Sequence, residues 1–212
     1  MKLPNFSFER KLWEKGYKVI AGVDEVGRGA FAGPVVAGAV VFAPNFRFRA
    51  LDSKLRINDS KKLTPKQREK AEIWIKENAL CWGIGEASVG QINRLGIKKA
   101  SEIAFRKAIS KTKPDFLLID AFYIPYVKGL RRRNQLAIVN GDEKSFSIAA
   151  ASIIAKVYRD GLMRKLGQRY ARYHWGDNKG YGTKKHQAAL KRYGVTKLHR
   201  KLFVRSFVSS RA

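Results

Sequence analysis

The stretch VIAGVDEVGRGAFAGPVVAGAVVF, residues 19–42, sets two apolar runs around a pair of acids and a glycine-rich turn. The first run ends at Val23, and Asp24 and Glu25 follow it directly. A Gly-Arg-Gly turn at residues 27–29 then leads into a second run rich in Val and Ala. Two buried strands joined by a polar connection are the simplest interpretation, and the acids between them indicate a site.

The chain is short and strongly basic. Its 212 residues suit one domain, or one domain with a small appendage, and 44 Lys and Arg against 17 Asp and Glu give a net charge of +27. Such a charge favours a polyanionic partner, nucleic acid first and an anionic membrane surface second. No segment approaches the ~20 apolar residues of a membrane span. The single cysteine, Cys81, excludes an internal disulfide, and a reducing, cytoplasmic location is the default expectation.

The remaining pattern alternates strands with helices. We predict strands at residues 17–23, 33–43, 79–88, 115–120 and 135–142, a loop at 47–62, and helices at 97–109 and 147–166. Another helix starts after Thr64, with Pro65 first and Gln67 completing a capping box. The basic end is predicted to be helical, with breaks at 176–181 and 194. This order indicates an α/β sheet with helices on its faces. We divide it into a main domain, 1–165, and a basic C-terminal helical segment, 166–212, packed on it as one structural unit.

Acids follow three of the predicted strands. Asp24 and Glu25 come after Val23, Asp120 ends the run DFLLID, and Asp142 follows QLAIVNG. Because ligand sites of α/β sheets lie at strand ends, the four carboxylates are predicted to meet. Oxygen ligands without Cys or His favour Mg²⁺ or Mn²⁺, and two such ions can support phosphodiester hydrolysis. For each acid taken alone, a helix cap or turn is the better interpretation. Acids after three separate strands of so basic a chain nevertheless favour the metal site.

Two further features point to contacts with a phosphate backbone. The first is Gly27-Arg28-Gly29, which is either a plain turn or a turn whose backbone amides approach a ligand oxygen closely. Neighbours on a strand face opposite sides, so Asp24 and Glu25 share a site only if the strand stops or twists, which the glycines at 27 and 29 permit. Ser152, Lys156 and Asp160 form a polar stripe at helical spacing. The stripe is either a Lys156–Asp160 ion pair or a phosphate site made by Ser152 and Lys156.

The chain resembles ribonuclease HII, the type 2 ribonuclease H family, over about residues 21–186. Five segments carry the resemblance in the family's order: AGVDEVGRGAFAGPVV, NDSKKLTPKQRE, DFLLID, VNGDEKSFSIAAASIIAKVYRD and NKGYGTKKH. The resemblance implies an RNase H-like fold, with a five-stranded mixed central sheet flanked by helices and a C-terminal helical segment. It also implies metal-dependent hydrolysis of RNA in RNA–DNA hybrids, and incision 5′ of ribonucleotides embedded in duplex DNA. The products carry a 3′-hydroxyl and a 5′-phosphate.

The resemblance assigns roles to individual residues. The family's metal-binding, catalytic acids fall on Asp24, Glu25, Asp120 and Asp142, with Asp24 and Asp120 expected to hold the ion that activates water. Its substrate contacts fall on the following positions: Gly27, Arg28, Gly29, Asp59, Ser60, Lys61, Ser152, Lys156 and Tyr181. The turn at 27–29 would contact the 2′-hydroxyl, which distinguishes RNA from DNA. Tyr181 would stack beside the junction, although a structural aromatic is the plainer interpretation of that residue alone.

Some positions depart from the family pattern. Ala121 stands where glycine is usual, Asn140 and Asn178 where Lys and His are expected, and Leu202 where serine is favoured. None removes an expected metal ligand. His174, His186 and His199 are taken as surface or structural residues.

Two rival functions remain at this point. Ribonuclease HIII shares the acids but usually carries an N-terminal substrate-binding domain, for which 23 residues before Asp24 leave no room. A non-catalytic basic RNA-binding protein of ribosomal type explains the charge but not the acids at strand ends. A duplex carrying one ribonucleotide separates these classes, because a binder shifts it and an enzyme nicks it. We expect a monomer acting on RNA–DNA hybrids and ribonucleotide-containing DNA, with no membrane partner.

Overall fold

In the computed structural model, which describes residues 3–46 and 57–208, five strands form one mixed sheet in the order β3-β2-β1-β4-β5. The three antiparallel neighbours are β1 (Ile20–Val26), β2 (Val35–Val41) and β3 (Cys81–Ala87). On the other side of β1, β4 (Phe116–Asp120) and β5 (Gln135–Ile138) run parallel to it. The predicted five-stranded mixed sheet is confirmed.

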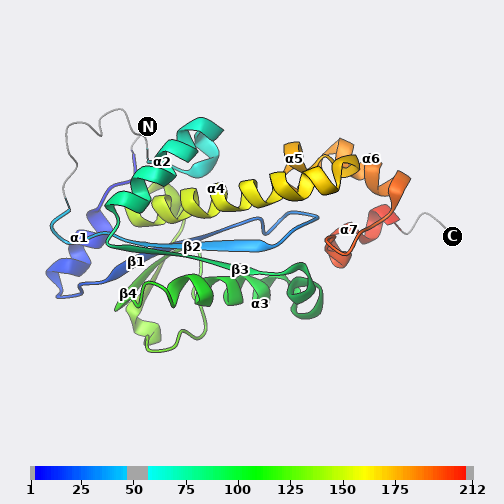
Figure 1. Cartoon of the computed structure of the whole chain (residues 1–212). Coiled ribbons are helices and arrows are strands. Elements are labelled where there is room, and N and C mark those ends of the chain that lie inside the picture. Colours follow the sequence, from blue (N-terminus) through cyan, green and yellow to red (C-terminus); the bar gives the residue numbers. More distant parts are fainter. Residues whose placement is uncertain (1–2, 47–56, 209–212) are drawn as a thin grey trace.

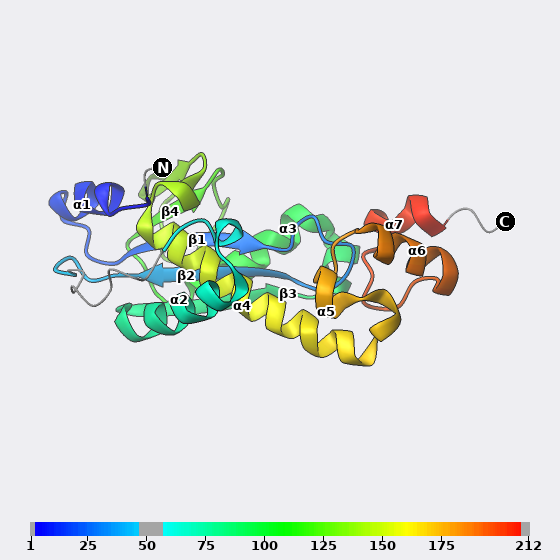
Figure 2. The same ribbon diagram turned by 90° about the horizontal axis from the view of Figure 1, so that it is seen from above.

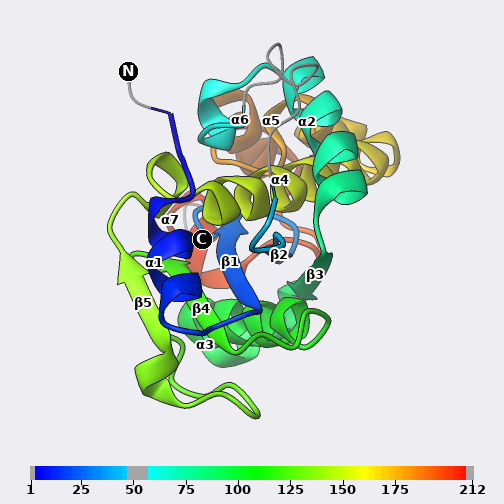
Figure 3. The ribbon, with the colours of Figure 1, turned by 90° about the vertical axis from the view of Figure 1, so that its left-hand side faces the viewer.

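Helices cover both faces of this sheet. The long helix α4 (Phe146–Arg169) crosses one face and α3 (Val89–Ile109) covers the other, as the end-on view shows most directly (Figures 1 and 3). Helix α2 (Pro65–Asn78) packs beside α4, and α1 (Ser7–Glu14) lies at the opposite end of the molecule from α7 (Lys201–Val208) (Figure 2). No helix among the described residues is both long enough and apolar enough to cross a membrane.

The C-terminal segment consists of short helices that share a core with α4. After a 3₁₀ turn at Ala171–Tyr173 come α5 (Trp175–Asn178), α6 (Lys184–Tyr193) and α7 (Lys201–Val208). Their buried apolar side chains pack against Met163 of α4 and Ala32 of the β1–β2 connection. The boundary predicted at residue 165 falls inside α4, so the segment continues from the catalytic part through an unbroken helix.

Several element boundaries differ from the sequence-based expectation. Strand β1 continues through Val26, so Asp24 and Glu25 lie within it instead of after it. Helix α3 begins at Val89, earlier than predicted, with a break at Gly96, whose φ of 78° is left-handed. The expected break from 176 is shorter, because α5 reaches Asn178. Of the predicted loop, residues 47–56 lie outside the described residues, and Ser60–Lys62 form a 3₁₀ turn.

The capping box is confirmed, because Thr64 Oγ1 accepts the Gln67 amide and the Gln67 side chain accepts the Thr64 amide. The N-terminal helix α1, which the sequence analysis did not identify, packs through Leu12 on a cluster that includes Ile20 and Phe116.

Two strand glycines let α4 approach the sheet closely. A Cβ atom on Gly22 would lie 2.2 Å from the Ser147 backbone, and one on Gly38 would lie 2.3 Å from the Ala151 carbonyl oxygen. Any side chain at these positions would lift the helix from the strands. Since α4 also carries Ser152, Lys156 and Asp160, this contact fixes the helix relative to the acids on β1.

We therefore expect Gly38→Ala to destabilise the fold by about 1–3 kcal/mol, as overpacking of a tight core does. Gly161→Ala is the matched control, because its Cβ would meet nothing closer than Arg164 Nη2 at 4.0 Å. It should stabilise α4 by about 0.5–1 kcal/mol through helix propensity. Urea unfolding measures both, and equal effects of the two changes would contradict the close packing.

Candidate metal centre and nucleic-acid site

Parallel strand pairing brings the acids to one end of the sheet. Val23 of β1 lies opposite Ile119 of β4, so Asp24 and Asp120, each the next residue, end up side by side. Asp142 lies on the other side of β4 from β1, in the 3₁₀ turn Gly141–Glu143 that follows β5. The Gly141 amide donates to Asp120 Oδ1 at 2.7 Å, which ties this turn to β4. The four acids therefore come from three neighbouring parallel strands.

Asp24 and Glu25 face different surroundings, as expected of neighbours on a strand. Asp24 is buried toward α4, where the Ser152 hydroxyl donates to it and in turn lies 3.0 Å from the Ser60 hydroxyl. Its Oδ1 also accepts the Glu25 amide at 2.7 Å. Glu25 lies 3.2 Å from Arg28 Nη1, on the turn that follows β1.

Negative charge accumulates at this end of the sheet without full compensation. Burial raises the pKa of Asp24 well above its usual value, and repulsion from Glu25, Asp120 and Asp142 adds to the shift. Burial also raises the pKa of Glu25 to about 7, although Arg28 opposes this, and that of Asp142 to about 6, with repulsion from Asp59 and Asp120 contributing. The carboxylates therefore act on each other electrostatically, and Arg28 and Lys61 compensate their charge only in part.

The carboxylates do not converge on one point. Among the described residues, no three Asp, Glu, His or Cys side chains gather closely enough to hold a metal ion. Local donors account for this, because Asp24 and Asp120 accept backbone amides, Glu25 pairs with Arg28, and Asp142 lies 3.9 Å from Lys61 Nζ. The sequence predicts that the four acids meet. Their backbone positions do lie at one end of the sheet, whereas their side chains contact separate partners.

The segment Asp59–Lys61 lies against the acidic end from the α2 side. Asp59 caps its 3₁₀ turn by accepting the Lys61 amide at 2.9 Å, and Ser60 is buried against Ser152. The Lys61 side chain is 81% exposed, with its ammonium directed at Asp142. Lys61 is thus an accessible cation beside the acids, whereas Asp59 and Ser60 hold the turn that presents it.

The polar stripe on α4 is an ion pair in this structure. Lys156 Nζ lies 2.9 Å from Asp160 Oδ1, and Asp160 also lies 3.8 Å from Arg68. Ser152 is 2% exposed and contacts Asp24 through its hydroxyl. A phosphate contact by Lys156 stays a prediction, supported by the 5.8 Å from its ammonium to the Tyr181 ring centroid. Lys156 of the stripe and the Tyr181 ring therefore lie next to each other.

Positions that depart from the family pattern have a structural explanation at three of the four sites. Ala121 and Asn140 adopt left-handed φ values of 61° and 55°, which explains why glycine is usual at the first. Asn178 accepts the Gly180 amide and donates to the Tyr173 carbonyl, so it organises the loop before Tyr181. Leu202 is 71% exposed on α7, and nothing in the structure explains it.

Two of the three histidines are structural. His186 and His199 are buried with their Nε2 atoms 3.1 Å apart, and His186 Nδ1 lies 2.9 Å from the Tyr181 carbonyl oxygen. The Thr196 amide donates to His199 Nδ1, so His199 Nε2 carries the proton and donates to His186. His174 is exposed. The pair steadies the backbone at Tyr181.

Sequence reasoning missed three buried charged residues that support the site. Glu9 of α1 accepts the Ser145 hydroxyl and the Ser147 amide at the start of α4, and Arg159 and Arg200 lie beneath the turn at 27–29. Charged residues are usually exposed, so their position along the chain gave no reason to expect burial.

Comparison with known proteins assigns the family. The model of the ribonuclease HII family matches residues 21–207. Ribonuclease HII of Chlamydia caviae is 48% identical, over 92% of this chain and 89% of that protein. Ribonuclease H2 from Pyrococcus horikoshii has a similar structure, with a TM-score of 0.67 and 27% identity over 90% of this chain and 97% of that one.

A more distant structural likeness concerns the fold alone. The structure of Bst-RNase HIII in complex with Mn²⁺ gives a TM-score of 0.71 at 19% identity, over 92% of this chain and 71% of that chain. The ribonuclease HII match excludes a ribosomal-type binding protein. The chain therefore belongs to the ribonuclease HII family, metal-dependent endoribonucleases that cleave RNA in RNA–DNA hybrids.

Proposed function

We propose that this enzyme cleaves the RNA strand of hybrids and also incises 5′ of single ribonucleotides in duplex DNA, leaving a 3′-hydroxyl and a 5′-phosphate. The observation that supports this most strongly is the arrangement of four acids from three parallel strands beside the turn at 27–29. The acids are thereby adjacent to the turn after β1, whose backbone would contact a 2′-hydroxyl.

The acids fit divalent cations such as Mg²⁺ or Mn²⁺. All four donors are carboxylates, the ligands that these hard ions prefer. The raised pKa values of Asp24, Glu25 and Asp142 indicate that Arg28 and Lys61 compensate the negative charge only in part. Asp24, Glu25, Asp120 and Asp142 would hold the ions by turning from their present amide, arginine and lysine partners. When bound, two such ions activate a water and stabilise the leaving oxygen.

The residues around the acids would place the substrate. The turn at 27–29 presents backbone groups to the sugar, and Tyr181 supplies an aromatic face next to it. Ser152 fixes the rotamer of Asp24 through its hydroxyl. Lys61 would contact a phosphate beside Asp142, because its ammonium is exposed and adjacent. These residues would contact the sugar and the phosphate backbone of the substrate. Cleavage would therefore not depend on the base sequence.

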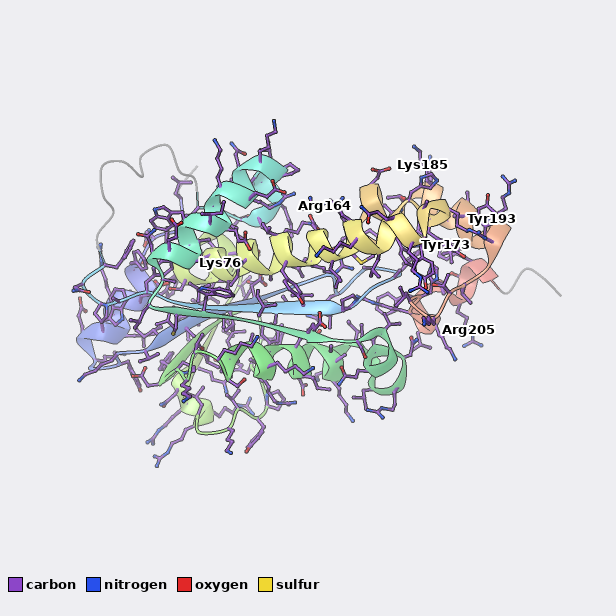
Figure 4. The ribbon with its side chains drawn as sticks, viewed as in Figure 1. Lys76, Arg164, Tyr173, Lys185, Tyr193 and Arg205 are labelled. Carbon is purple, nitrogen blue, oxygen red and sulfur yellow. The ribbon has the colours of Figure 1, made fainter. Side chains whose placement is uncertain are left out.

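Cations spread toward the C-terminal end would grip the duplex. Figure 4 shows Lys185 on α6 and Arg205 on α7 at the same end of the molecule. From residue 161 onward the chain has fourteen Lys or Arg and a single acid, Asp177. Each neutralised phosphate contributes about 0.9 to the slope of log affinity against log salt concentration. Duplex binding is therefore expected to weaken steeply with salt.

Asp24→Asn tests the catalytic assignment. The substitution keeps the shape and the bond to the Glu25 amide but removes the charge needed beside Asp120. Mg²⁺-dependent nicking of a duplex with one ribonucleotide should fall by about 10³-fold or more, with duplex affinity unchanged within about twofold. Asp115→Asn, away from the acidic end, should leave nicking intact. Retained cleavage by Asp24→Asn would end the assignment.

The same variant makes a stability prediction for the metal-free protein. The pKa of Asp24 is raised on folding, so the ionised carboxylate destabilises the fold, and this penalty grows as the pH rises above the unfolded value of 3.8. In EDTA, Asp24→Asn should therefore exceed the wild type in stability by about 1–3 kcal/mol at pH 8, and by less at pH 5. Chemical denaturation measures this difference. Saturating Mg²⁺ should abolish the advantage, and a variant that is less stable in EDTA at pH 8 would refute the account.

A further inference from the structure

Two arginines are completely buried beneath the substrate turn. Arg159, on α4, and Arg200, just before α7, both have no exposed surface. Within the described residues, neither guanidinium forms an ion pair with a carboxylate. Burial and repulsion from Arg159 lower the pKa of Arg200 to about 9, so the two cations lie near each other. Buried charges are ordinarily paired, and this arrangement therefore needs another reason.

Arg159 binds two separate loops to each other. Its Nε donates to the Pro34 carbonyl at 3.0 Å and its Nη2 to the Ala32 carbonyl at 3.1 Å, both in the β1–β2 connection. Its Nη1 donates to the Lys179 carbonyl at 2.9 Å, two residues before Tyr181. The guanidinium also lies 5.4 Å from the Tyr181 ring centroid. One side chain thus fixes the loop after the turn and the loop that carries the tyrosine.

Arg200 binds the turn itself. Its Nη1 donates to the Arg28 carbonyl at 2.8 Å and its Nε to the Gly33 carbonyl at 3.0 Å. Its Nη2 is buried and has no hydrogen-bond partner among residues 3–46 and 57–208, so holding the guanidinium there leaves one donor group unsatisfied. The Arg200 amide also donates to the Phe31 carbonyl at 2.8 Å. The start of α7 is thereby attached to both ends of the 28–33 segment.

Gly27 shows how closely the turn lies on these arginines. Its φ is +91°, and a Cβ atom there would stand 2.1 Å from Arg159 Nε. The turn therefore rests on the guanidinium with no side chain between them. A planar fork of five donors can satisfy carbonyls from several loops at once, which a lysine ammonium at the same place cannot do.

We propose that Arg159 and Arg200 are positioning residues, which hold the turn at 27–29 and Tyr181 at a fixed separation so that both engage one ribonucleotide. The inference rests on the proposed substrate contacts of the turn and of Tyr181. Neither arginine touches the substrate, because both are covered by the loops they bind. Their contribution is the spacing between two contacts that come from distant parts of the chain.

The test uses Arg159→Lys and Arg200→Gln, with Arg10→Lys as the control on the exposed side of α1, away from the proposed duplex contacts. For a duplex with a single ribonucleotide, kcat should fall about 10- to 100-fold in both variants, as misplacement near a reacting centre does. KM should change less than about twofold, because the phosphate contacts of the C-terminal segment persist. Arg10→Lys should match the wild type in kcat.

A double-mutant cycle separates positioning from general loss of structure. If Arg159 acts through Tyr181, Arg159→Lys should cost much less in kcat when Tyr181 is already Ala, whereas damage to the fold would multiply with that change. Hydrogen exchange gives a readout without turnover: protection should drop around residues 27–33 and 179–182 in the variants, and not at β3.

The outcomes distinguish this inference from the proposed function. Unchanged kcat together with unchanged exchange at the two loops would overturn the positioning role. A wild type that fails to nick the singly substituted duplex, while the variants still lose protection at both loops, would overturn the proposed substrate and leave the coupling of the two loops established. If Arg159→Lys does not fold, Arg200→Gln decides the matter, because glutamine keeps a donor and removes the unpaired nitrogen.

Discussion

Parallel pairing of β1 with β4 is the interaction on which the site depends. It sets Val23 opposite Ile119, and the next residue of each strand is an aspartate. A shift of one residue in this register would send one of the two carboxylates to the other face of the sheet. The pairing is buried on both sides, by α3 below and α4 above, and Gly22 and Gly38 allow the close contact with α4. The chemistry is thus located by backbone hydrogen bonds and by packing, before any metal or substrate is considered.

The second constraint is electrostatic. A chain with a net charge of +27 places four of its few acids at one end of the sheet, where burial and mutual repulsion raise the pKa values of three of them. Each carboxylate then takes a nearby amide or cation as a provisional partner. Beneath the adjacent turn, two buried arginines lack carboxylate partners among the described residues. Negative charge therefore lies on the carboxylates, and positive charge lies nearby beneath the turn. This separation of charge is the pattern expected for holding cations beside a phosphate backbone.

The sequence predicted the parts of this arrangement that follow from local patterns. Apolar runs of strand length identified the five strands, and acids at the ends of three of them located the candidate centre. Features that depend on tertiary contacts could not be predicted in this way. Strand β1 continues through Val26 because β2 pairs with it to that point, and no local pattern in the turn reveals this pairing. Burial of Arg159, Arg200 and Glu9 depends on carbonyls and helix ends brought from distant segments. The family resemblance supplied Tyr181, whose surroundings come from residues far along the chain.

The central claim is that these four carboxylates form one binding site for two cations. Electron paramagnetic resonance of Mn²⁺ bound to the wild type, with an uncleavable duplex present, tests it directly. The account predicts two ions per chain with the spin coupling of neighbours about 3.5–4 Å apart, and loss of that coupling when either Asp24 or Asp120 becomes asparagine. Mn²⁺ binding that is uncoupled, or that is unaffected by both substitutions, would contradict it.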